Sequence, residues 1–122
     1  MSFDHIGFTV PSFLKSRDFY VSALAPLDIG IVHEGADWAA FGENGRVLLW
    51  IGSGPSLRAS IHLAFAARDK SAVAAFHAAA TEAGGRDNGA PGYRPQYHPG
   101  YYAAFVLDPD GHNIEAVFHE RV

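Results

Sequence analysis

Three side chains of this 122-residue chain are candidates to bind a metal ion, namely His5, His62 and Glu115. Each histidine lies on the less apolar face of a predicted strand, and Glu115 lies within an apolar run. A buried lone carboxylate is costly unless a cation, a hydrogen-bond donor or a metal compensates it. Two imidazoles and a carboxylate that converge form the facial triad of divalent-metal sites, which leaves positions open for water and substrate.

Each of these residues also has a simpler interpretation. A single strand histidine is more often a hydrogen-bonded core or surface residue than a ligand. Glu115 would be an ordinary solvated side chain if its strand turned that face outward. Two histidines at equivalent positions of an internal repeat favour the metal interpretation.

The apolar periodicity predicts the elements that would position these residues. Ser12 is a predicted cap of the first helix, Gly84 closes the second, and Asn44-Gly45 is typical of a hairpin turn. Segment 86–100 is rich in Pro and Gly and is predicted to be irregular. The predicted helices span 13–24 and 70–83, and the predicted strands span 3–10, 27–33, 38–42, 47–51, 60–66, 102–107 and 113–118.

The order of elements is repeated, and a shift of 57 positions superimposes the two halves. This shift places His5 on His62, Phe8 on Phe65, Phe19 on Phe76 and Ala23 on Ala80. Further along, segment 38–41 resembles segment 102–105 at an offset of 64. We therefore predict an α+β fold of two tandem βαβββ modules, about 1–55 and 58–122, within a single domain 1–122.

The repeat also compares the last strands of the two modules. Aligning Gly45 with Gly111, an offset of 66, places Leu49 opposite Glu115. If the fold offers four symmetric ligand positions, this alignment predicts that three are filled by ligand types and one by an aliphatic residue.

Segment 93–101 contains three tyrosines, a histidine and an arginine, which suits an aromatic mouth over a pocket. His98 is a candidate proton carrier and Arg94 a candidate anion anchor. The alternative is a loop whose rings simply pack on the sheet. The candidate substrate contacts are Trp50, Arg94, Tyr97, Tyr101 and Tyr102.

Composition excludes several classes of protein. Cysteine is absent, which rules out disulfides and thiolate metal sites and favours a reducing compartment. The net charge of −4, without a basic stripe, argues against nucleic acid. No apolar stretch is long enough to span a membrane and the N-terminus lacks the features of a signal peptide, so a cytoplasmic location is expected.

Four segments, 4–10, 16–20, 61–65 and 108–115, together resemble the vicinal oxygen chelate superfamily of glyoxalase I, bleomycin-resistance proteins, extradiol dioxygenases and fosfomycin-resistance transferases. The closing Asp-Pro-Asp-Gly-x-Asn-Ile-Glu run is the most specific part. The resemblance implies paired modules curled into a cup around a divalent metal, with His5, His62 and Glu115 as its ligands. Fe, Mn, Zn, Ni and Co all tolerate this ligand set.

The resemblance also implies an activity and an assembly. Glyoxalase I usually has a fourth ligand, a Glu in the fourth strand, where Leu49 is aligned, so a three-ligand site is more similar to the dioxygenases and transferases. In small two-module members two chains commonly complete each cup, so His5 of one chain would join His62 and Glu115 of its homodimer partner. We expect a metal-dependent enzyme acting on a small oxygen-chelating substrate by lyase, isomerase, transferase or dioxygenase chemistry. The alternatives are a metal-free protein that sequesters a drug-like molecule and a structural or regulatory dimerisation module.

Overall fold

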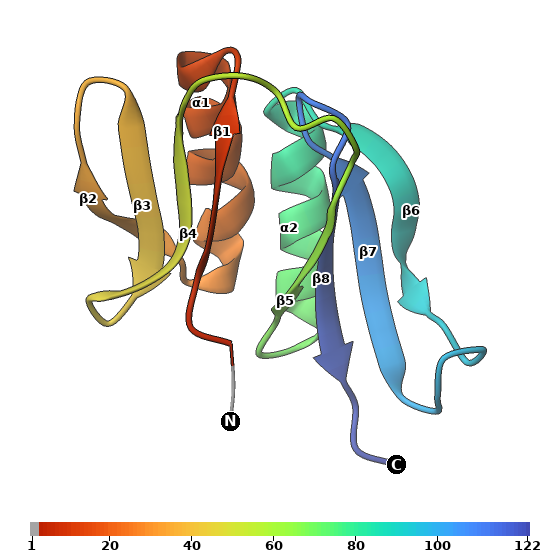
Figure 1. Ribbon diagram of the computed structural model, residues 1–122. Helices are drawn as coiled ribbons and strands as arrows, with labels where there is room; N and C mark the ends of the chain where they lie inside the picture. The colour runs from red at the N-terminus through yellow and green to blue at the C-terminus, as the bar shows by residue number, and fades with distance from the viewer. Residues whose placement is uncertain (1–2) are drawn as a thin grey trace.

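A computed structural model describes residues 3–122, which form two four-stranded mixed sheets with one helix packed on each (Figure 1). The strand orders are β1-β4-β3-β2 and β5-β8-β7-β6. β1 pairs with β4 in parallel, and β5 pairs with β8 in the same way. The predicted α+β class with two tandem modules is confirmed. The elements are β1 Ile6–Val10, α1 Phe13–Leu24, the 3-10 helix η1 Ala25–Leu27, β2 Gly30–Glu34, β3 Trp38–Glu43, β4 Arg46–Ser53, β5 His62–Ala66, α2 Lys70–Glu82, β6 Arg86–Tyr93, β7 Tyr101–Leu107 and β8 Asn113–His119.

The two helices begin where their sequences predict, although the capping differs. Ser12 occupies the N-cap of α1 but makes no capping hydrogen bond through its side chain. Asp69 caps α2, since its carboxylate accepts a hydrogen bond from the N–H of Ala72 at 2.7 Å. Of the helices in residues 3–122, none is long and apolar enough to cross a lipid bilayer.

The prediction that segment 86–100 is irregular is wrong for its first half, because β6 pairs with β7. Proline and glycine predict a loop, but β6 is an edge strand, where a missing N–H donor and a weak ladder are tolerated. The pairing is interrupted on both sides of Gly89, so the strand bends rather than running straight.

Strand register corrects the alignment of the two halves. Trp50 pairs with Gly7 in the first sheet, and Glu115 pairs with Ala64 in the second, so Trp50 and not Leu49 corresponds to Glu115. Leu49 is fully buried on the helix side, as is Ile114, its true counterpart. The offset is therefore 65 along β3/β7, rather than 64, and along β4/β8 it changes from 66 at Val47 to 65 from Leu49 onward.

A β-bulge explains the error. The partners in the β3–β4 hairpin change from Phe41 with Leu49 to Gly42 with Val47, which leaves Leu48 as an extra residue. The β7–β8 hairpin has no such interruption. Because side chains alternate between the faces of a strand, a one-residue error in register assigns every side chain to the wrong face.

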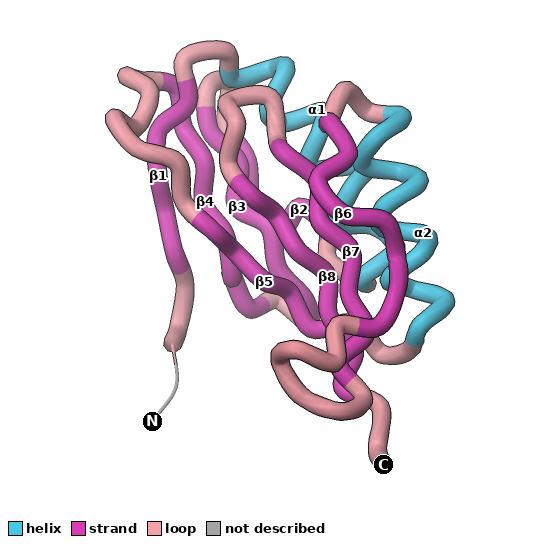
Figure 2. Tube along the Cα trace, turned by 90° about the vertical axis from the view of Figure 1, so that its right-hand side faces the viewer, coloured by secondary structure: helices cyan, strands magenta, loops and turns pink. Residues whose placement is uncertain are grey.

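The main core lies between the sheets and the helices, which cover the same side of both sheets (Figure 2). Large apolar side chains such as Phe19, Phe41 and Phe76 are fully buried there. A second, small cluster of Ala103, Phe105 and Val117 lies apart from this core, on the face of the second sheet that the helices leave open. The open faces of both sheets are therefore the surfaces on which a site can be built.

A buried polar contact joins the two modules. Tyr20 of α1 donates a hydrogen bond to Asp108 at 2.5 Å, and Asp108 also accepts from the backbone N–H groups of Asp110 and His112. Burial, followed by the charge of Asp108, raises the pKa of Tyr20 well above its ordinary value. The Asp-Pro-Asp-Gly run thus has a structural role, because it anchors the first module to the turn before β8.

Candidate functional site

The central pair of the candidate site is His62 and Glu115. The Nε2 atom of His62 lies 2.8 Å from Oε1 of Glu115, across the parallel pair β5 and β8. Glu115 is only 1% exposed, whereas the His62 side chain remains about half exposed, at 53%. Glu115 is therefore not a solvated, outward-facing side chain, and its buried carboxylate needs a partner, as the sequence predicted.

Tyr101 completes the environment of this carboxylate. Its hydroxyl donates a hydrogen bond to Oε2 of Glu115, so each carboxylate oxygen has one partner. Burial first, and then this hydrogen bond, raise the pKa of Tyr101 to about 12. The phenol is therefore a proton donor at neutral pH, and it fixes the orientation of the carboxylate toward His62.

His5 lies apart from this pair within one chain. It precedes β1 of the first sheet, and its Nδ1 atom lies 2.7 Å from Asp4. That hydrogen bond lowers the pKa of Asp4. Within residues 3–122, no group of three His, Cys, Asp or Glu side chains is arranged to hold a metal ion. The structure therefore brings together two of the three predicted ligands.

The open face of the first sheet carries Trp50 and Trp38. These two indoles lie beside glycines: a Cβ on Gly52 would come closer than 3.0 Å to the Trp50 ring, and one on Gly35 would do so to the Trp38 ring. With His5, His33 and other residues they line a concavity of about 470 Å³. Trp38 supported the sequestering alternative in the sequence but was not among the predicted substrate contacts; its pairing with Gly52 across β3 and β4 places it on the same face as Trp50.

The loop after β6 approaches the central pair through Tyr101. The rings of Tyr97 and His98 lie edge-on to Tyr101, at centroid distances of 5.0 and 5.2 Å. His98 also contacts His119, with 3.1 Å between Nε2 and Nδ1 and the rings stacked. His119 is not among the predicted site residues, although it has the same strand parity as Glu115, which favours it over the other remaining histidines.

Tyr102 does not join this cluster. It packs against Tyr93, with ring centroids 5.0 Å apart, and against the helix-side core. Neighbouring residues of a strand point to opposite faces, so Tyr101 and Tyr102 cannot both face the site. Arg94 lies on the open face, with its guanidinium carbon 5.3 Å from the centroid of the Phe105 ring.

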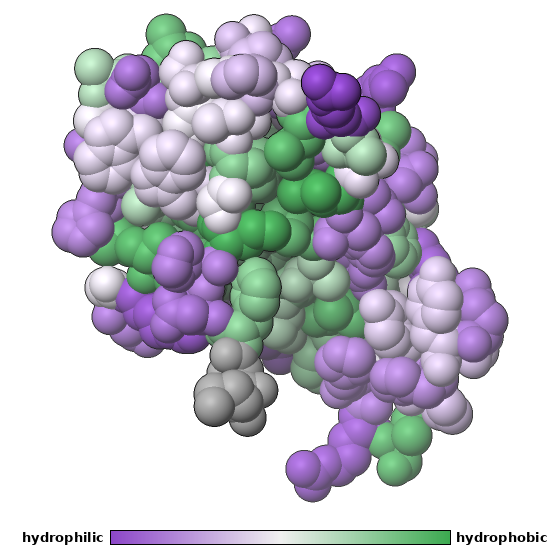
Figure 3. Space-filling view, in the orientation of Figure 1, coloured by the Kyte–Doolittle hydropathy of each residue, from purple (hydrophilic) through white to green (hydrophobic). Residues whose placement is uncertain are grey.

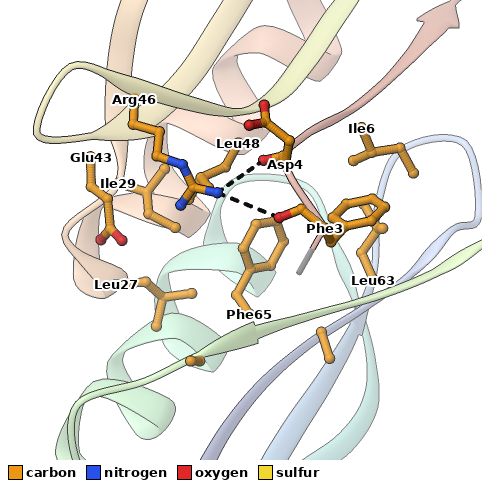
Figure 4. Close-up of a pocket in the computed structure, with 12 residues that line it drawn as sticks. Phe3, Asp4, Ile6, Leu27, Ile29, Glu43, Arg46, Leu48, Leu63 and Phe65 are labelled. Atoms are coloured by element: carbon orange, nitrogen blue, oxygen red, sulfur yellow. Dashed lines mark hydrogen bonds between the residues drawn. The ribbon is translucent and has the colours of Figure 1, made fainter. Parts of the chain in front are cut away.

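A groove of about 370 Å³ separates the two sheets, and Phe3, Ile6, Leu48, Leu63 and Phe65 converge on it (Figure 4). We call these five residues the apolar band. In the space-filling view, apolar side chains gather between the two modules (Figure 3). Phe3 is 68% exposed, so the band is open to solvent. The groove is flanked by β1 and β5, each of which has a partner strand on one side only.

Comparison with known proteins assigns the family. The profile of the Glyoxalase/Bleomycin resistance protein/Dioxygenase superfamily matches residues 2–116, and the chain belongs to this superfamily. Comparison with curated proteins gives no match.

Similar solved structures include a glyoxalase/bleomycin resistance protein from Albidiferax ferrireducens, with 28% identity over 95% of this chain and 97% of that one and a TM-score of 0.78. A glyoxalase-related enzyme from Fulvimarina pelagi has 23% identity, coverage of 96% and 87%, and a TM-score of 0.74. A lactoylglutathione lyase from Agrobacterium tumefaciens has 14% identity, coverage of 96% and 92%, and a TM-score of 0.68. The last two similarities concern the fold.

Proposed function

We propose that this protein is a divalent-metal-dependent enzyme acting on a small oxygen-chelating substrate, with His62 and Glu115 as two of its metal ligands. The observation that carries the proposal is the buried Glu115 carboxylate, held 2.8 Å from the Nε2 atom of a half-exposed histidine. A carboxylate that is buried among apolar neighbours and aimed at a half-exposed histidine fits a metal better than a purely structural role.

The donor set fits a divalent first-row metal such as Fe, Mn, Zn, Ni or Co, because imidazole nitrogen and carboxylate oxygen suit all five. A metal held there would act as a Lewis acid toward negative charge that develops on a substrate oxygen. Tyr101 orients Glu115 and holds a proton at its hydroxyl beside the site. His98, in contact with Tyr101, is the candidate for moving protons between the site and solvent.

A second copy of the chain would supply the missing ligand. His5 and His62 lie at the starts of β1 and β5, the two strands that flank the apolar groove. A two-fold axis through this groove would bring β1 of each chain toward β5 of the other, so that both sites are completed together. The same contact would cover the exposed apolar band. We therefore propose a homodimer in which His5 of one chain joins His62 and Glu115 of its partner.

In this dimer the Trp50 face of one chain would cover the central pair of the other. Trp50 would line the wall opposite Glu115, since the two residues hold corresponding positions in the two modules. Tyr97 and Tyr101 would line the mouth formed by the loop after β6. Because Trp50 would take the place of a fourth ligand and an indole does not bind metal, the site would keep three protein ligands and leave positions open for substrate.

Metal analysis and calorimetry test this proposal directly. We expect wild-type protein, purified without chelators or affinity metals, to bind about one divalent ion per chain, which is the stoichiometry of the shared-site dimer. Glu115→Gln should lose that ion, since an amide is a poor replacement for a charged ligand. Glu82→Gln, which alters an exposed carboxylate on α2, is the matched control and should retain it. Equal metal content in the Glu115 variant and the wild type would contradict the proposal.

A second candidate function rests on the indoles of Trp38 and Trp50. Two partly exposed indoles beside bare glycine backbone suit a protein that sequesters a drug-like aromatic molecule without chemistry. Quenching of tryptophan fluorescence by such a molecule in chelator-treated protein, with no metal bound by the untreated protein, would favour this candidate over the enzyme.

A further inference from the structure

Arg94 folds back over the second sheet. Its Nη1 donates a hydrogen bond to the carbonyl of Gly92 at 2.9 Å, and its Nη2 donates to the carbonyl of Ala90 at 2.8 Å. The bend of β6 makes room for this conformation. A Cβ on Gly89 or Gly92 would lie only 3.1 or 3.3 Å from a guanidinium nitrogen, so glycine at these positions leaves space for the charged group.

Among the described residues, no carboxylate forms an ion pair with this guanidinium. Across residues 3–122, ion pairs within 4.0 Å join Arg17 and Arg68 to acidic side chains, but none involves Arg94. Its two partners are neutral carbonyls, and a guanidinium has further N–H donors beyond those two. Arg94 is also partly buried, which strengthens its interaction with any anion that reaches it.

Phe105 connects this charge to the central pair. The guanidinium lies 5.3 Å from the Phe105 centroid, and the His62 ring lies 6.2 Å from the same centroid. Phe105 is also the cross-strand partner of Glu115. A small molecule with one end at His62 and Glu115 would therefore lie across an apolar ring with its other end at Arg94.

We propose that Arg94 is the recognition site for an anionic group, a carboxylate or a phosphate, on the molecule that binds beside His62 and Glu115. That the other end of the bound molecule lies at His62 and Glu115 rests on the proposed function, but anion binding itself requires only Arg94. A protein with a net charge of −4 repels anions in general, so a specific cation is needed to hold one. The planar guanidinium matches both oxyanions through paired hydrogen bonds.

Nuclear magnetic resonance on the metal-free protein tests the proposal without any contribution from metal. Inorganic phosphate and succinate are titrated separately at constant ionic strength, and the side-chain Nε–Hε signal of Arg94 is followed. We expect a saturable shift of this signal, and binding weakened at least about tenfold in Arg94→Gln. Arg94→Lys should bind with intermediate strength, because it keeps the charge and loses the planar fork. Arg86→Gln, at an exposed position at the start of β6, the strand that precedes Arg94, should bind like the wild type.

The tighter of the two probes assigns the anionic group as phosphate or carboxylate. The absence of a saturable shift in the wild type would overturn the proposal, as would equal binding by the wild type and Arg94→Gln. If the Gln variant fails to fold, the wild-type shift and the Lys variant decide the question. A purely structural Arg94 would lower the thermal midpoint in its variants and leave the wild type without anion binding. Metal content is measured separately, so failure of the metal proposal would not be mistaken for failure of this one.

Discussion

Mixing two inactive variants tests whether the metal site is shared between chains. One variant, His5→Ala, removes a proposed ligand from the first module. The other, Glu115→Gln, removes a proposed ligand from the second module. In a shared-site homodimer, each variant alone has no complete ligand set, so neither should retain metal. A mixed dimer regains one complete set, in which His5 of the Glu115 variant joins His62 and Glu115 of the His5 variant.

The expected amount of recovered metal follows from random pairing of the two variants. Equal amounts of the two variants, randomly reassorted, would place about half of the chains in mixed dimers, each with one intact site out of two. Recovered metal should therefore be about one quarter of the wild-type content per chain. Reassortment by partial unfolding and refolding, followed by metal analysis of the dimer fraction, measures this value.

The matched control mixes His62→Ala with Glu115→Gln. These residues lie 2.8 Å apart in one chain, so no mixed dimer contains an intact pair and no metal should return. If the first mixture also recovers no metal although mixed dimers form, the shared-site reasoning is refuted. A monomeric wild type that still binds metal would refute it as well.

Two further sets of predictions concern the hydroxyl groups of Tyr20, which is buried, and Tyr101, which is partly buried. Tyr20→Phe should destabilise the protein by about 1.5–3 kcal/mol, because Asp108 loses one donor in a buried site, and should lower the thermal midpoint by roughly 5–12 °C; a midpoint within error of the wild type would contradict this. In metal-free protein Tyr101 should titrate near pH 12, as followed by tyrosinate absorbance. Since folding raises this pKa, the associated stability is present below about pH 10 and is lost as the pH rises through 12. Glu115→Gln should lower the pKa of Tyr101 toward its ordinary value, and an unchanged titration would show that burial alone sets it.

Local patterns in the sequence predicted most of the elements. The spacing of apolar residues predicted α1 and α2, and the strands other than β6 were located to within a few residues. β6 could not be predicted, because its glycines and proline are typical of loops and only pairing with β7 makes the segment a strand. Long-range pairing therefore outweighed local propensity at this edge.

The candidate site was predictable in its residue types but not in its arrangement. His62 and Glu115 were selected as ligands because a histidine recurs in the repeat and a carboxylate interrupts an apolar strand. The hydrogen bond from Tyr101 could not be derived, since it depends on how β7 lies beside β8. Nor could the sequence show that Tyr102 packs on the helix side of the sheet while Tyr101 faces Glu115.

The amino-acid sequence alone shows that the chain contains two similar modules and that a histidine recurs at equivalent positions, His5 and His62, 57 residues apart. Only the folded structure shows on which face of its sheet each side chain lies and which side chains come together. The bulge at Leu48 placed Trp50 in the position that corresponds to Glu115, and the groove between β1 and β5 separated His5 from the central pair. The physical reason is that apolar periodicity acts over a few residues, whereas register and module packing depend on contacts between residues far apart in the chain.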